Sequence, residues 1–236
     1  TEDACGLVAR HMMLGRDPNR ALPYAIRAAV YCTLQGRFNE SRNWLMAIDP
    51  MRRDRNDPTY KALRFQLAWA RARTSLNTDL SRNRDDLVRQ AEERMRTSEE
   101  RLLVTVLQSD VGMREGRVQA AIDRMLDQAG TMDETATGWL YLKAARMYLD
   151  LGDPKQARSV LPKTAILGAH PNRAVVGIDL ARLEGRTDTV IEGCHQAIAR
   201  SSRLESDPFF GILQCRLGWG LLARGDRVGA TQSAHL

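Results

Sequence analysis

Residues 138–161 read GWLYLKAARMYLDLGDPKQARSVL, a pattern typical of two helices joined by a tight turn. In the first half, apolar side chains recur every three or four positions and share one helical face: Trp139, Leu142, Ala145 and Leu149. We expect Gly152 to end this helix, because glycine adopts the left-handed cap conformation without steric cost. Asp153 is a favourable N-cap for the next helix, and Pro154 suits its first position. Such a pair cannot bury both of its faces alone, so further pairs are expected beside it.

The same stop signal recurs along the chain. Glycine followed by Arg or Asp stands at Gly15, Gly36, Gly116, Gly152, Gly185 and Gly225, and we expect Asn77 to cap a helix in the same way. From Gly36 onward the intervals are 41, 39, 36, 33 and 40 residues. Two helices in each interval predict an all-α fold, an α-solenoid of about five to six stacked antiparallel helix pairs. Alternating runs of Val, Ile and Thr are missing, so no strands are predicted.

Two of these units carry a more specific pattern. Small residues, an aromatic or Leu, a glycine and an alanine follow one another at fixed spacings in Ala145, Tyr148, Gly152 and Ala157, and again in Gly218, Leu221, Gly225 and Ala230. This order resembles the tetratricopeptide-repeat superfamily, with degenerate repeats over roughly residues 19–236. The resemblance implies a superhelix whose first helices line a concave, peptide-binding groove.

We expect a single helical-repeat domain over residues 1–236. Within it, residues 1–50 form irregular N-terminal units, residues 51–97 a basic unit and residues 98–236 the better-formed repeats. The chain begins without Met and without a signal-peptide pattern. We therefore expect it to be a segment of a larger protein.

The four cysteines are far apart and fit no metal-binding spacing: Cys5, Cys32, Cys194 and Cys215. Free thiols, mostly on apolar helical faces, are the simplest interpretation, and two disulfide bridges are the alternative. Free thiols favour a reducing compartment, so we predict a cytoplasmic location. No apolar run approaches the roughly 18–20 residues of a membrane span.

No known catalytic motif appears in the chain. It lacks a phosphate-binding Gly-rich loop, a His-Glu-x-x-His motif and a Gly-x-Ser-x-Gly elbow. Cys194 and His195 are neighbours, but adjacent helical residues point about 100° apart and do not form a nucleophile–base pair readily. We therefore predict that the protein is not an enzyme and has no catalytic residues, no metal site and no cofactor.

Positive charge is concentrated in one segment. Residues 51–84 hold nine basic and three acidic residues, which equals the net charge of +6 of the whole chain. This segment is the alternative binding surface, represented by Arg52, Arg53, Arg55, Arg64 and Arg71. A solvated helical face is the other interpretation of such a run.

The tetratricopeptide resemblance places the partner-binding positions on the first helices of the units. Carried over to this chain, the groove set is Trp139, Lys143, Arg146, Arg182, Arg216 and Trp219. Arginine suits bidentate capture of carboxylates. We expect the three arginines to face one concavity, where first-helix acids offset them only partly: Asp110, Asp150 and Asp179. The alternative is that the large apolar members of this set belong to the core between repeats.

The main functional prediction is a non-enzymatic protein–protein interaction module that holds an acidic protein or peptide segment in its groove. The alternative is the sensory or regulatory domain of a bacterial transcription activator. Such a domain would bind a small-molecule ligand or a partner and signal to a DNA-binding domain outside this segment. An RNA-binding array would repeat the same base-reading positions in every unit. The chain does not, so nucleic-acid contact by this segment is not predicted.

Overall fold

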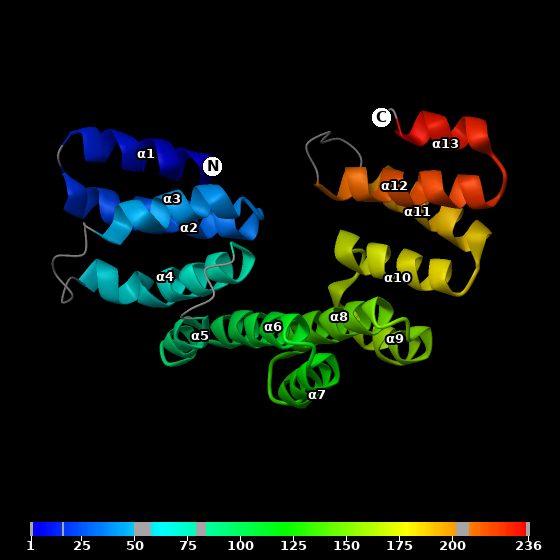
Figure 1. Cartoon of the computed structure of the whole chain (residues 1–236), viewed down its shortest axis with the longest axis horizontal. Helices are drawn as coiled ribbons and strands as arrows, with labels where there is room; N and C mark the ends of the chain where they lie inside the picture. Colours follow the sequence, from blue (N-terminus) through cyan, green and yellow to red (C-terminus); the bar gives the residue numbers. More distant parts are fainter. Residues whose placement is uncertain (1, 16, 50–57, 79–83, 202–207, 235–236) are drawn as a thin grey trace. The chain divides into compact units, whose positions relative to one another are not determined.

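A computed structural model describes residues 2–15, 17–49, 58–78, 84–201 and 208–234, and every regular element among them is a helix. The chain divides into two compact units, Thr1–Arg117 and Val118–Leu236. The predicted all-α fold is confirmed, with helices that pack mainly against their neighbours in sequence. Figure 1 shows the helices of each unit.

The first unit contains α1 (Glu2–Leu14), α2 (Pro18–Leu34), α3 (Phe38–Ile48), α4 (Pro58–Asn77), α5 (Arg84–Glu92) and α6 (Ser98–Arg114). The second contains α7 (Val118–Ala129), α8 (Glu134–Asp150), α9 (Pro154–Val160), the 3₁₀ helix η3 (Leu161–Leu167), α10 (Pro171–Leu183), α11 (Thr187–Ser201), α12 (Pro208–Ala223) and α13 (Arg227–Ala234).

In the first unit, α2 and α4 are the central helices. Helix α2 packs against α1, α3 and α4, and α4 packs in turn against α5 and α6. The core is built from small and aliphatic side chains together with two aromatic ones, Phe65 and Trp69. Ala25, Ala29 and Ala70 are fully buried, which allows the helix backbones to approach closely.

Three hydroxyl groups are buried together where α2, α3 and α4 meet. The Ser41 hydroxyl lies 2.7 Å from that of Thr33 and 2.9 Å from that of Thr74. The Thr33 hydroxyl also donates to the Ala29 carbonyl oxygen at 2.8 Å. These groups satisfy one another inside the core, because a buried hydroxyl without a partner would destabilise the fold.

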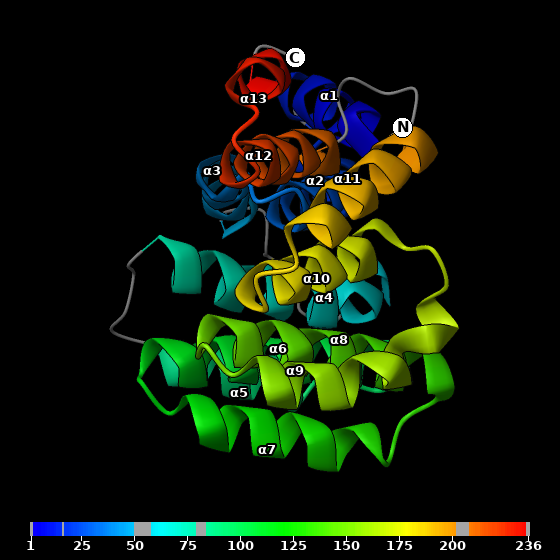
Figure 2. The ribbon, with the colours of Figure 1, turned by 90° about the vertical axis from the view of Figure 1, so that its right-hand side faces the viewer.

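In the second unit, the first helices of successive pairs stack on one another. Helix α8 contacts its partner α9 and the next first helix α10; α10 contacts α11 and α12; and α12 contacts α13. Figure 2 allows the order α8, α10, α12 to be followed. The core around α10–α13 is mostly aliphatic and includes Val190, Cys194 and Leu213, all with no exposed surface.

The predicted turn after α8 is confirmed. Gly152 has a φ of 73°, and the Asp153 carboxylate accepts a hydrogen bond from the Gln156 backbone N–H at 3.1 Å. Gly36, Gly116, Gly185 and Gly225 also have positive φ angles, whereas Gly15 does not and the prediction of a left-handed cap there is wrong. Asn77 was wrongly expected to cap: it is the last residue of α4, and its side-chain amide donates to the Arg73 carbonyl oxygen.

Two further stretches add to what the sequence predicted. Helix α5 ends at Glu92 and is followed by a turn, and Thr97 is the N-cap of α6, which begins at Ser98. Thr97 and Glu100 form a reciprocal capping box at the start of α6. Between α9 and α10, the chain continues as the 3₁₀ helix η3, which no sequence signal predicted. Within the described residues, no helix combines the length and apolar character that crossing a membrane would require.

We predict that Gly152→Val destabilises the second unit by about 1–2 kcal/mol or more. A side chain in the left-handed region clashes with its own backbone, and a β-branched one clashes most. The thermal midpoint should fall by several degrees. Gly211→Val is the control, since Gly211 is exposed in α12, has no left-handed φ and has no atom within 4 Å of an added Cβ. Equal midpoints for the two variants would contradict the turn assignment.

Candidate functional site

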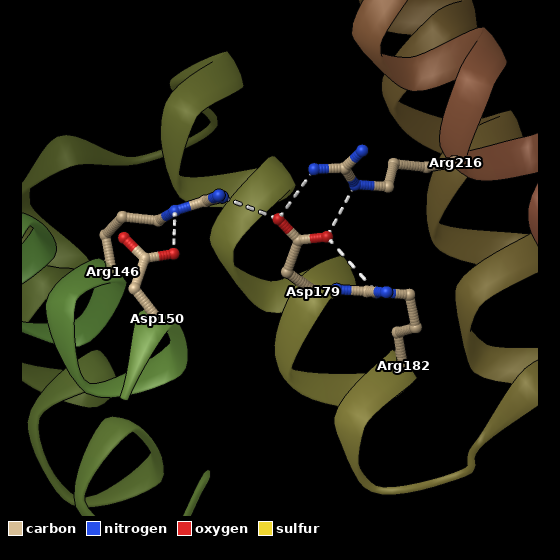
Figure 3. Close-up of polar contacts among 5 residues, drawn as sticks. All are labelled: Arg146, Asp150, Asp179, Arg182 and Arg216. Atoms are coloured by element: carbon tan, nitrogen blue, oxygen red, sulfur yellow. Dashed lines mark hydrogen bonds and ion pairs between the residues drawn. The ribbon is translucent and has the colours of Figure 1, made fainter. Parts of the chain in front are cut away.

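Three of the six predicted groove residues, all arginines, lie around one carboxylate. Asp179 lies on α10 with its side chain only 4% exposed, and Arg146 and Arg216 reach it from α8 and α12. Figure 3 shows the arrangement. Arg146 donates from Nη1 to Asp179 Oδ2 at 2.6 Å, and its Nε forms a second ion pair with Asp150 at 3.2 Å. One buried anion therefore links three consecutive first helices.

Arg216 makes the most complete contact with this carboxylate. Its Nε donates to Asp179 Oδ1 at 2.5 Å and its Nη2 to Oδ2 at 3.2 Å, which is the bidentate geometry of a guanidinium–carboxylate pair. Donating these hydrogen bonds to Asp179 raises the pKa of the Arg216 guanidinium above its ordinary value.

Arg182 is the least constrained arginine of the group. Its Nε lies 3.7 Å from Asp179 Oδ1, buried and without a hydrogen bond to any described residue. Its guanidinium carbon lies 5.4 Å from the centre of the Trp219 ring, a cation–π contact. Trp219 itself is 42% exposed. A cation and an indole therefore reach the surface together, next to the buried carboxylate.

The other two groove residues lie on the same helix as Arg146. Trp139 packs edge-on against His170, with ring centroids 4.7 Å apart, and Lys143 is half-buried one turn before Arg146. His170 caps α10, accepting from the Asn172 N–H at 3.2 Å. Contacts at the starts of α8 and α10, and again near their ends at Asp179, require the two helices to run parallel.

The structure shows where the acids near the three arginines lie. From the sequence, Asp110, Asp150 and Asp179 were expected to offset these arginines only partly. All three arginines lie around Asp179, Arg146 also pairs with Asp150, and Asp110 pairs with Arg73 in the first unit. These contacts mean that replacing Arg146 by an acid would place two carboxylates together in a buried site, which would damage the fold.

The alternative basic surface is only partly described. Arg52, Arg53 and Arg55 lie outside the described residues. Arg71 of α4 forms an ion pair with Asp49, and Arg64 on the same helix is half-buried. The neighbouring Arg73 pairs with Asp110 of α6. Arg71 and Arg73 are thus engaged in contacts between helices of the first unit.

The cysteines and acids show no reactive arrangement in the described part of the chain. All four cysteines are free, and no group of three or more His, Cys, Asp or Glu side chains there is placed to hold a metal ion. Burial raises the pKa of the Cys194 thiol to about 11, so it is neutral at physiological pH and a poor nucleophile. Its neighbour His195 is exposed.

A cavity that the sequence did not predict lies between η3, α10 and α11. Its volume is about 580 Å³, and its lining includes Gly177 and Ile178 of α10 and Gly193 of α11, with Arg173 and Arg200 also contributing. A signal was present in the sequence, because glycine in the interior of a helix usually has a packing or functional reason.

Comparison of the chain with models of protein families and with curated protein sequences finds no match.

We predict that Asp179→Asn lowers the free energy of unfolding by about 3–5 kcal/mol, because three guanidinium groups lose the anion that compensates them. Urea denaturation followed by circular dichroism measures this change. Asp150→Asn is the matched control: its carboxylate is 43% exposed, and its loss should cost no more than about 1 kcal/mol. Similar losses for the two variants would show that Asp179 is not a special anchor.

We predict that stability also falls in the alkaline range because of Cys194. Its pKa is near 9 when unfolded and about 11 when folded, so the folded state holds the proton more tightly. The resulting stabilisation is complete below pH 9 and is lost as pH rises towards 11, by up to about 2–3 kcal/mol. Urea denaturation measures the free energy of unfolding at pH 8 and pH 10.5, and it should fall less between these pH values in Cys194→Ala than in the native protein. An identical fall in both proteins would contradict the raised pKa of Cys194.

Proposed function

We propose that the chain is a non-enzymatic recognition module that holds an acidic segment of another protein against its first helices α8, α10 and α12. In this proposal the helix pairs are stacked as in the tetratricopeptide-repeat superfamily, and the groove is the surface around Asp179. The repeated glycine turns and the contacts between successive first helices support the stacking. The chemistry of the surface supports the choice of partner.

The observation that carries the proposal is that the negative side chain is buried while the positive side chains around it are partly exposed. Asp179 is buried, whereas the side chains of Arg146, Arg182 and Arg216 are 39%, 36% and 28% exposed. Three arginines stand against Asp150 and Asp179, so this cluster of five residues carries a net charge of +1. A fixed positive surface attracts acidic segments and speeds their encounter.

Arg182 and Trp219 are the contact residues expected to contribute most. Arginine and tryptophan are the residue types most often found at the energetic centre of protein interfaces. The indole holds the Arg182 guanidinium in place before a partner arrives, which lowers the entropic cost of binding. The Arg182 side chain is 36% exposed, so part of it is accessible to a carboxylate of the partner.

A second candidate function is the ligand-sensing regulatory domain predicted from the sequence. The cavity between α10 and α11 favours it, since its volume lies in the range of small-molecule sites. This candidate concerns a different surface of the second unit and is tested separately below.

Fluorescence anisotropy with a labelled glutamate octapeptide tests the recognition surface. We expect Arg182→Gln to raise Kd by about threefold to tenfold, because a half-exposed charge-assisted contact is lost. Arg124→Gln removes the same charge from the exposed face of α7 and should leave Kd within about twofold. Raising the salt concentration should weaken binding of the native protein. Equal effects of the two variants would show non-specific charge attraction and contradict the proposed surface.

A further inference from the structure

The cavity between η3, α10 and α11 has the size of a small-molecule site. Its volume of about 580 Å³ falls within the roughly 300–1,000 Å³ of typical ligand pockets. All of its lining residues belong to the second unit and are described. The cavity therefore has a defined position within one compact unit, where α10 and α11 pack against each other (Figure 2).

The lining is chemically divided. Small and aliphatic residues dominate it, including Ala174, Ile178 and Ala197, whereas Arg173 and Arg200 are its charged residues. No Asp or Glu lines the cavity. A ligand with an apolar body and a negative head group matches both parts of this lining, and a cation does not.

Arg173 is held in position before any ligand binds. Its Nε donates to the Thr164 hydroxyl at 2.9 Å, and its Nη1 donates to the Gly168 carbonyl oxygen at 3.0 Å. Arg200 stands exposed in the last turn of α11, on the opposite helix. The two guanidinium groups reach the cavity from different elements, one fixed by the protein and one free to adjust.

Gly177 keeps the cavity open without being needed for packing. A Cβ built at Gly177 has no atom within 4 Å, so any side chain there would extend into open space. A Cβ at Gly193, by contrast, would lie 3.1 Å from Ile178 Cγ1, so this glycine serves the contact between the helices. Glycine weakens a helix relative to alanine, and at position 177 the structure gives no steric reason for it other than the cavity.

We propose that this cavity binds a small amphipathic carboxylate, with its apolar body over Gly177 and Ile178 and its carboxylate between Arg173 and Arg200. Arginine is suited to this role because its planar donors match the geometry of a carboxylate. The site is distinct from the surface around Asp179, so it does not depend on the proposed peptide recognition.

The test measures displacement of the fluorescent anion 1-anilinonaphthalene-8-sulfonate by octanoate and by octan-1-ol, which share an apolar body and differ in charge. We expect octanoate to displace the reporter at a concentration at least about tenfold lower than octanol does. Arg200→Gln should lower the affinity for octanoate by about tenfold and leave the affinity for octanol unchanged.

Gly177→Leu should fill the cavity and abolish binding of the reporter and of octanoate, with an unchanged or higher thermal midpoint. Gly211→Leu, on the exposed face of α12, should bind as the native protein does. Unaltered octanoate binding by Gly177→Leu would show that the binding site is not this cavity. Equal potency of octanoate and octanol would show that the site does not select an anionic ligand. An unchanged octanoate affinity in Arg200→Gln would overturn the proposed contact.

Discussion

A carboxylate removed from water needs compensation from the protein, and the burial of Asp179 imposes that requirement on three helices at once. Desolvation of such a group costs several kcal/mol unless good geometry and hydrogen bonds offset it. Arg146 from α8 and Arg216 from α12 supply those bonds, and Arg182 adds a third cation from α10 itself. The same guanidinium groups extend to the surface, so the residues that fix the register of the helices also form the proposed recognition surface.

Contacts between first helices recur at the same sequence separation in both units. In each unit, two contacts join residues 37 positions apart on the same two helices: Arg73–Asp110 and Asn77–Arg114, then Asp179–Arg216 and Arg182–Trp219. Two equal separations require the helices of each pair to run parallel and in register. This separation of 37 residues lies within the 33–41 residues between the glycine turns, and two of the four contacts are charge pairs.

Short sequence patterns predicted the individual helices and turns well, but they did not predict the contacts between helices. Gly152 and Asp153 act through their own backbone and nearest turn, so their roles could be predicted from a few residues. Asp179 could be placed on a first helix, but its burial depends on how α8 and α12 approach it, which no local pattern encodes. The cavity was missed for the same reason: Gly177 is informative only once the empty space beside it is known.

A double-mutant cycle between Asp179 and Arg216 tests the central claim most directly. The unfolding free energies of Asp179→Asn, Arg216→Gln, the double variant and the native protein give the coupling between the two side chains. We predict a coupling of about 1.5–3 kcal/mol, because either single variant removes the charge-assisted contact between Asp179 and Arg216, and the double variant can lose that contact only once. Additive effects, within about 0.5 kcal/mol, would show that the Asp179 carboxylate does not tie α10 to α12, and would contradict the account.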